Sequence, residues 1–191
     1  MCVIPWDGVC HPFIEVTRGD FADFGSSAPH SVCRRAAGDD EFGPELADFV
    51  EDMAQTMYAA PGVGLAAPQV GDGRRILVAN LKGDVDEDSR DELVIMINPV
   101  IRERSQENIR WEESCLSVPE YDLDVDRSMR IHVEWRDVAG DPQSGWFEEF
   151  PAVVLQHEMD HLDGVTLLDR SSRLKRGRYM KRRKKAARGR G

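Results

Sequence analysis

The sequence predicts an α+β domain in which mostly antiparallel sheets surround a central helix that carries an HExxH pattern. A helical hydrophobic pattern begins at Pro44, several strand-like segments follow it, and a second helical segment, PAVVLQHEMDHL, ends at Asp163 and Gly164. A helix, a run of strands with short turns and a second helix is an order typical of α+β domains. With 191 residues, 41% of them hydrophobic, the chain is long enough for one domain with a substantial core.

The first helix and two buried strands are predicted from hydrophobic spacing. From Pro44 onward, apolar residues recur at three- and four-residue steps, which indicates an amphipathic helix that ends near Pro61 and Gly62. The segments RILVANL (75–81) and ELVIMINPVI (92–101) are apolar runs typical of buried strands. Residues before Pro44 show no clear period, apart from a possible strand from Phe13 to Thr17.

A hairpin and the last helix complete the predicted domain. MRIHVEWRD (129–137) alternates apolar and polar residues, as a strand with one buried face does. AGDPQSG (139–145) predicts a turn, and WFEEF (146–150) predicts the partner strand. Pro151 suits the first turn of the final helix, because a proline there loses no internal hydrogen bond.

Charge divides the chain into an acidic body and a basic tail. The residues up to Asp169 contain 13 Lys and Arg against 35 Asp and Glu, a net charge of −22, whereas 12 Lys and Arg and no acidic residue follow Asp169. A tail of this charge density binds phosphate backbones or remains a solvated, disordered extension. We expect three parts: an irregular N-terminal extension (1–29), one main domain (30–169) and a basic C-terminal helix or tail (170–191).

Composition also excludes several classes of protein. No apolar run is long enough to span a membrane, and the opening MCVIPW does not resemble a signal peptide, so we expect a cytoplasmic protein without membrane contact. Four cysteines without CxxC spacing (Cys2, Cys10, Cys33 and Cys115) favour free thiols over a disulfide framework.

The segment QHEMDHLDG (156–164) predicts a metal site. Residues four apart lie on one face of a helix, so His157 and His161 can bind one ion while Glu158 lies beside it. A catalytic site of this kind needs a third protein ligand and an open position for water. The best candidate is Cys115 in WEESCLSVPE, although a lone cysteine is more often a small buried hydrophobe. His132 alternates onto the polar side of its strand, which favours an exposed position over ligation.

Three segments together resemble the peptide deformylase family. GVGLAAPQVG (62–71), ESCLS (113–117) and QHEMDHLDG (156–164) resemble the family's three motifs in the same order. The resemblance implies that Cys115, His157 and His161 bind a divalent metal, natively Fe(II), with Zn, Ni or Co as possible replacements because ligand affinity does not select iron. It also implies hydrolysis of the N-formyl group on the first methionine of a new polypeptide, with release of formate.

The resemblance assigns further roles around the metal. Glu158 is the expected acid and base, while Gln69 and the backbone N–H of Leu116 are expected to stabilise the oxyanion. The expected substrate-binding residues border the methionine pocket and are Val63, Gly64, Glu113, Val153 and Val154. The family usually carries glycine where this chain has Ser114, and if that position requires positive φ, serine strains the loop that carries Cys115.

The expected partners are formyl-methionyl nascent peptides and, through the basic tail, the ribosome and its RNA; the protein itself is expected to be a monomer. Two alternatives remain open at this point. HExxH alone also permits a metallopeptidase that cuts ordinary peptide bonds. The basic tail also permits an RNA-binding protein in which Cys115, His157 and His161 hold a structural ion, although such a site needs a fourth protein ligand.

Overall fold

The computed structural model of the chain describes residues 41–83 and 92–188, so the predicted extension (1–29) and the predicted strand near Phe13 lie outside the described residues. The helices are α1 (Pro44–Ala59), the short 3-10 helix η1 (Ala67–Val70), α2 (Glu149–Leu162) and α3 (Arg173–Arg188). The strands are β1 (Gly64–Ala66), β2 (Ile76–Asn80), β3 (Leu93–Arg104), β4 (Asn108–Cys115), β5 (Val118–Ser128), β6 (Arg130–Arg136) and β7 (Pro142–Glu148).

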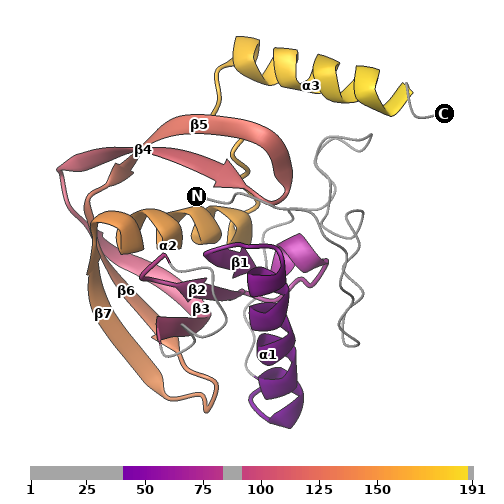
Figure 1. The fold of residues 1–191 in the computed structure, drawn as a ribbon. Coiled ribbons are helices and arrows are strands. Elements are labelled where there is room, and N and C mark those ends of the chain that lie inside the picture. The colour runs from indigo at the N-terminus through magenta and orange to yellow at the C-terminus, as the bar shows by residue number, and fades with distance from the viewer. Residues whose placement is uncertain (1–40, 84–91, 189–191) are drawn as a thin grey trace.

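The strands form a five-stranded sheet in the order β1-β2-β3-β6-β7 and a separate β4–β5 hairpin. All pairings between the described strands are antiparallel, which confirms the predicted α+β class with mostly antiparallel sheets. Helix α2 contacts strands of both sheets and lies between the hairpin and the larger sheet (Figure 1). Its residues therefore face two layers at once.

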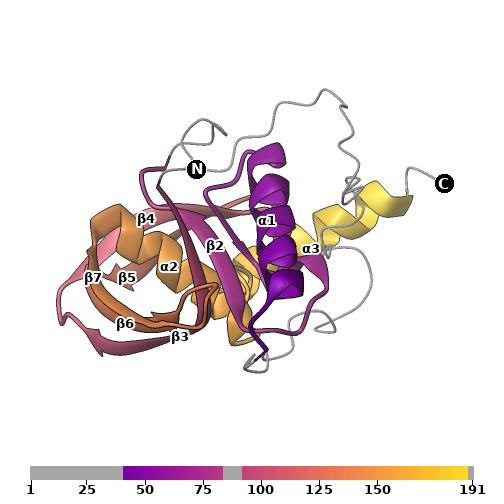
Figure 2. The same ribbon diagram turned by 90° about the horizontal axis from the view of Figure 1, so that it is seen from below.

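Helices α1 and α2 cover opposite faces of the larger sheet, and β2 lies between them (Figure 2). Ile76 and Val78 pack in the core cluster that contains the apolar side of α1. Leu77 and Ala79, which point to the other face, pack in the cluster that contains the apolar side of α2. Every residue of β2 is therefore buried, which explains why this strand is a continuous apolar run in the sequence.

The predicted first helix and the two apolar strands are confirmed, with β3 continuing three residues beyond Ile101. The predicted hairpin strand 146–150 was wrong at both ends, because β7 begins at Pro142 and residues 149–150 belong to α2. The turn is shorter than predicted because the Asp137 side chain accepts hydrogen bonds from the backbone N–H groups of Ala139 and Asp141.

Helix α3 extends from the domain and contacts it through side chains near its middle. Tyr179 is only 3% exposed, its ring centroid lies 5.0 Å from that of Tyr121, and its hydroxyl donates to the carbonyl of Pro119. Arg182 donates to the carbonyl of Glu120. The basic helix therefore rests on the β4–β5 hairpin. None of the helices among the described residues has the length and apolar character needed to cross a membrane.

Candidate metal centre

A cysteine and two histidines converge between α2 and the hairpin. The ligand atoms of Cys115, His157 and His161 all lie within 4.8 Å of one another, and Cys115 Sγ is 3.3 Å from His161 Nε2. Cys115 and His161 are buried, and His157 is half-buried. Thiolate and imidazole groups are usual ligands of zinc-like divalent cations, and three protein ligands leave a fourth position for water. The residues therefore fit a divalent cation.

Local structure explains how these three side chains meet. On α2 the two histidines are one turn apart, so their rings lie on the same face, with centroids 5.0 Å apart. Cys115 is the last residue of β4, and the pairing with β5 shifts between Ser114 and Cys115, where Cys115 pairs with Val118. Such an irregularity changes the direction of a side chain relative to its strand. The hairpin end thereby presents the sulfur to α2.

A chain of charged residues supports His157 from behind. Nδ1 of His157 lies 2.8 Å from Glu113 Oε2, and Arg127 donates to both Glu113 oxygens at 2.6 and 2.8 Å. Arg127 also donates to Asp160, whose carboxylate accepts two hydrogen bonds from Arg170. With Nδ1 directed to the carboxylate, Nε2 of His157 is the nitrogen available to a metal.

The charges in this chain shift the acidity of its members. Burial alone would raise the pKa of Glu113, but the hydrogen bonds from Arg127 and His157 outweigh it and lower that pKa to about 2. Burial likewise opposes a charge on His157, yet its hydrogen bonds to Cys115 and Glu113 raise the pKa of His157. Burial, together with the nearby His157, lowers the pKa of His161. Metal binding displaces only the protons on the sulfur and nitrogen atoms that become ligands, so the Nδ1 proton of His157 can stay on its contact with Glu113.

Arg127 was not among the residues that the sequence predicted for this site. Its side chain is 4% exposed, and it lies between Glu113 and Asp160 in the ion pairs behind His157. The sequence does carry a signal, because YDLDVDR alternates and puts Arg127 on the same inward side as Leu123 and Val125, which are both buried. A charged residue at an inward position indicates a buried ionic partner.

Glu158 lies buried inside the site. It is 4% exposed, and its Oε2 is buried with no hydrogen-bond partner among the residues that the structure describes. Burial, the largest effect, raises the pKa of Glu158 to about 7. Gly64 makes room for it, because a Cβ atom there would lie only 2.8 Å from Glu158 Cδ.

Gln69 and the hairpin turn form the opposite edge of the site. The backbone N–H of Ala66 donates to Gln69 Oε1 at 2.8 Å, which fixes the amide so that Nε2 faces Ser117 Oγ at 3.2 Å and Cys115 Sγ at 4.0 Å. Leu116 follows Cys115 directly and lines the same cavity. Gln69 Nε2 thus points toward the sulfur of Cys115.

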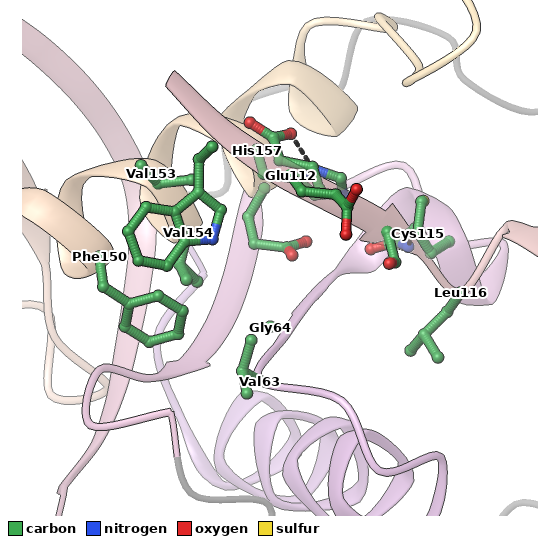
Figure 3. Close-up of a pocket in the computed structure, with 14 residues that line it drawn as sticks. Val63, Gly64, Glu112, Cys115, Leu116, Phe150, Val153, Val154 and His157 are labelled. Carbon is green, nitrogen blue, oxygen red and sulfur yellow. Dashed lines mark hydrogen bonds and ion pairs between the residues drawn. The ribbon is translucent and has the colours of Figure 1, made fainter. Parts of the chain in front are cut away.

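The cavity beside Cys115 and His157 has an apolar end. Its empty space, including its open mouth, is about 490 Å³. The predicted residues Val63, Gly64, Glu113, Val153 and Val154 all line it. Figure 3 shows Val153, Val154 and Phe150 at one end and Cys115 and Leu116 at the other. The apolar end also contains two aromatic residues that the sequence reasoning did not select, Trp111 and Phe150.

The structure also shows the surroundings of Ser114 and His132. Ser114 is not among the residues with positive φ, so serine causes no strain of the kind that glycine would relieve. Its hydroxyl instead bonds to Asp122 Oδ1 at 2.6 Å. His132 is half-buried on β6, with its ring centroid 5.0 Å from that of Trp146, and it is not part of the ligand cluster.

The chain is similar to known proteins over most of its length. A family model described as polypeptide deformylase matches residues 26–177. A peptide deformylase of Desulfotalea psychrophila is 46% identical over 144 residues, which are 75% of this chain and 83% of the relative. The crystal structure of a peptide deformylase from Legionella pneumophila aligns with a TM-score of 0.76 at 34% identity, covering 85% of this chain and 93% of the other.

A second solved structure gives the same result. A peptide deformylase from Synechococcus elongatus in complex with actinonin aligns with a TM-score of 0.75 at 32% identity and covers 90% of this chain and 94% of the other. The family match spans all three predicted sequence motifs, ending beyond α2. The chain therefore belongs to the polypeptide deformylase family, metal-dependent hydrolases that remove the N-formyl group from newly made polypeptides.

Proposed function

We propose that Cys115, His157 and His161 bind the catalytic metal and that α2 is the metal-binding HExxH helix of this enzyme. The convergence of these three ligand atoms within 4.8 Å is the observation that carries the proposal. A divalent cation held there supplies a Lewis acid that polarises the formyl oxygen and makes water more acidic. We propose Fe(II) as the native ion, with Zn, Ni or Co able to occupy the same ligands.

Glu158 is the proposed acid and base of the reaction. Formamide hydrolysis requires a group that removes a proton from water and later delivers one to the departing amine nitrogen. Glu158 lies inside the cavity, and burial raises its pKa to about 7, so its carboxyl group can hold or release a proton near neutral pH. Gly64 leaves the space that this carboxylate occupies.

Gln69 and Leu116 are the proposed donors to the developing oxyanion. The hydrogen bond from Ala66 N–H to Gln69 Oε1 turns the Nε2 donor toward the sulfur of Cys115. The backbone of Leu116 lies at the hairpin turn beside the same cavity. Donors fixed before the reaction stabilise the transition state more than the substrate, and loss of one commonly lowers kcat by about 10²- to 10³-fold.

Val63, Gly64, Val153 and Val154 are proposed to bind the methionine side chain, because they line the apolar part of the cavity. Glu113 was expected among the substrate-binding residues, and it does line the cavity. Both of its oxygens, however, are hydrogen-bonded to Arg127 and His157. We therefore propose that Glu113 orients His157 and contributes to substrate binding only through the wall of the pocket.

Formate release is the direct test of this assignment. Protein prepared anaerobically with Fe(II) should release formate from formyl-Met-Ala-Ser, and a chelator should abolish the release. The same peptide with a free amine should give no product. Cleavage of the free-amine peptide would instead indicate the metallopeptidase alternative. Neither this alternative nor the RNA-binding alternative is favoured by the family assignment.

The basic helix α3 is the proposed contact with the ribosome, and residues 30–169 are the proposed catalytic domain. Lys181, Lys184 and Lys185 on α3 are exposed, while Tyr179 holds the helix to the domain. The exposed lysines would neutralise RNA phosphates and release counterions, which makes binding sensitive to salt.

Because new polypeptides leave the ribosome in the cytosol, we also propose a cytoplasmic location.

Replacing these three lysines with glutamine tests the proposed ribosome-binding surface better than truncation does, since truncation also removes the buried ring of Tyr179. The substitutions should weaken ribosome binding and reduce its salt dependence, by about 0.7 to 0.9 in log–log slope for each phosphate that a lysine no longer neutralises. Activity on a short formylated peptide should remain unchanged. Ribosome binding with unaltered affinity and slope would refute the proposed role of α3.

A further inference from the structure

Two aromatic rings form the wall at the apolar end of the cavity. Trp111 on β4 and Phe150 at the start of α2 have ring centroids 5.8 Å apart and planes tilted by 49°. Both residues line the cavity, and both are only half-buried, so part of each ring is open to it. Among the described residues, the other apolar side chains that line the cavity, including Val153 and Val154, are aliphatic.

Phe150 is held in its position by the backbone of Glu149 and by a close contact with Gly83. Glu149, the preceding residue, has a φ of 54°, a conformation that residues other than glycine rarely adopt, and its N–H donates to the carbonyl of Met129 at 2.8 Å. Gly83 lies against the ring from behind, since a Cβ atom there would come within 2.9 Å of Phe150 Cε1. Local strain of this kind is typical of residues fixed for function.

We propose that Trp111 and Phe150 are specificity-determining residues that select a thioether-containing first side chain. Sulfur in a thioether is polarisable and makes favourable contacts with aromatic rings at about 5 Å. This proposal rests on the proposed function, because the cavity must receive the side chain of the formylated residue. Recognition of sulfur is separate from recognition of apolar length, which the valines provide.

Norleucine separates these two contributions. It has the length and shape of methionine but carries a methylene group in place of sulfur, and the methylene is the more hydrophobic of the two. A purely apolar pocket should therefore bind norleucine at least as well as methionine. An aromatic wall that contacts sulfur should reverse this order and favour methionine by about 2- to 10-fold in kcat/KM.

A second aromatic pair in the same protein provides a matched control. Trp135 and Phe147 also have centroids 5.8 Å apart, with planes tilted by 50°, and Phe147 packs on the same core cluster as Phe150. Neither residue lines the cavity. Phe147→Leu therefore removes a comparable ring from a comparable environment without changing the pocket.

The experiment measures kcat/KM for formyl-Met-Ala-Ser and formyl-Nle-Ala-Ser with the metal-loaded enzyme. The wild type and Phe147→Leu should favour methionine, whereas Phe150→Leu and Trp111→Leu should bring the ratio to about one or below. The ratio is taken on a single enzyme sample, so any inactive fraction cancels. An unchanged ratio in both pocket variants, or a wild type that prefers norleucine, overturns the inference and leaves the proposed function intact. Formate release from neither peptide overturns both.

Discussion

His157 Nδ1 and Glu113 Oε2 lie 2.8 Å apart, and the same carboxylate is fixed by Arg127 on its other side. This contact connects the helix that supplies two histidines with the strand that supplies Cys115. A histidine whose second nitrogen is held by a carboxylate has a fixed ring orientation and a more basic metal-binding nitrogen. The geometry of the centre therefore depends on residues that do not themselves contact a metal.

Glu113→Gln should weaken metal binding by about 10- to 100-fold, the usual effect of losing such a supporting carboxylate. The substitution also leaves the buried Arg127 without one of its charged partners. Chelator competition measures the change in metal affinity. Glu112→Gln, at the exposed neighbouring position, should leave the affinity unchanged. Equal affinity in wild type and Glu113→Gln would show that this carboxylate does not support His157.

Glu158→Gln should lower kcat for formate release by about 10²- to 10⁴-fold, the contribution typical of a general acid–base group. Metal content should be retained, because the ligand atoms of Cys115, His157 and His161 do not include this carboxylate. Steady-state kinetics and elemental analysis on the same preparation check both parts. A variant that keeps its activity would remove Glu158 from the proposed mechanism.

Gly64→Ala should lower kcat by about 10- to 100-fold, because displacement of a catalytic group by an ångström has effects of that size. The added Cβ would lie 2.8 Å from Glu158 Cδ and must push the carboxyl group away. Gly73→Ala is the matched control, since a Cβ there meets no atom within 4 Å. Similar kinetics in the two variants would mean that the space beside Glu158 is not limiting.

The stabilisation that Asp137 gives to the β6–β7 hairpin should be lost in acid. Hydrogen bonds from the backbone N–H of Asp141 and from Gln143 lower the pKa of Asp137 below its ordinary value of 3.8. A lowered pKa means that the stabilisation is present above that ordinary value and is lost as the pH falls below it. The urea concentration at the unfolding midpoint should decrease more from pH 5 to pH 3 in the wild type than in Asp137→Asn. Parallel decreases would refute a contribution from this carboxylate.

Hydrophobic period and motif spacing were sufficient to predict much of this protein. The steps of three and four residues from Pro44 predicted α1, and the apolar runs predicted β2 and most of β3. These features are local, because the spacing of apolar residues within a helix or strand indicates whether it buries one face or both. The i, i+4 spacing of His157 and His161 is local in the same sense, and it identifies the pair without reference to Cys115.

Tertiary structure decided which distant residues complete the site. The sequence offered Cys115 only as the best candidate, and the irregular pairing at the end of β4 brings its sulfur to 3.3 Å from His161. Arg127, Trp111 and Phe150 were not selected, because an inward arginine or an aromatic residue has many possible partners until the strands are placed. Glu113 bonds to His157 across 44 positions of the chain. Contacts between segments so far apart depend on how the sheets and α2 pack, and no local pattern encodes that packing.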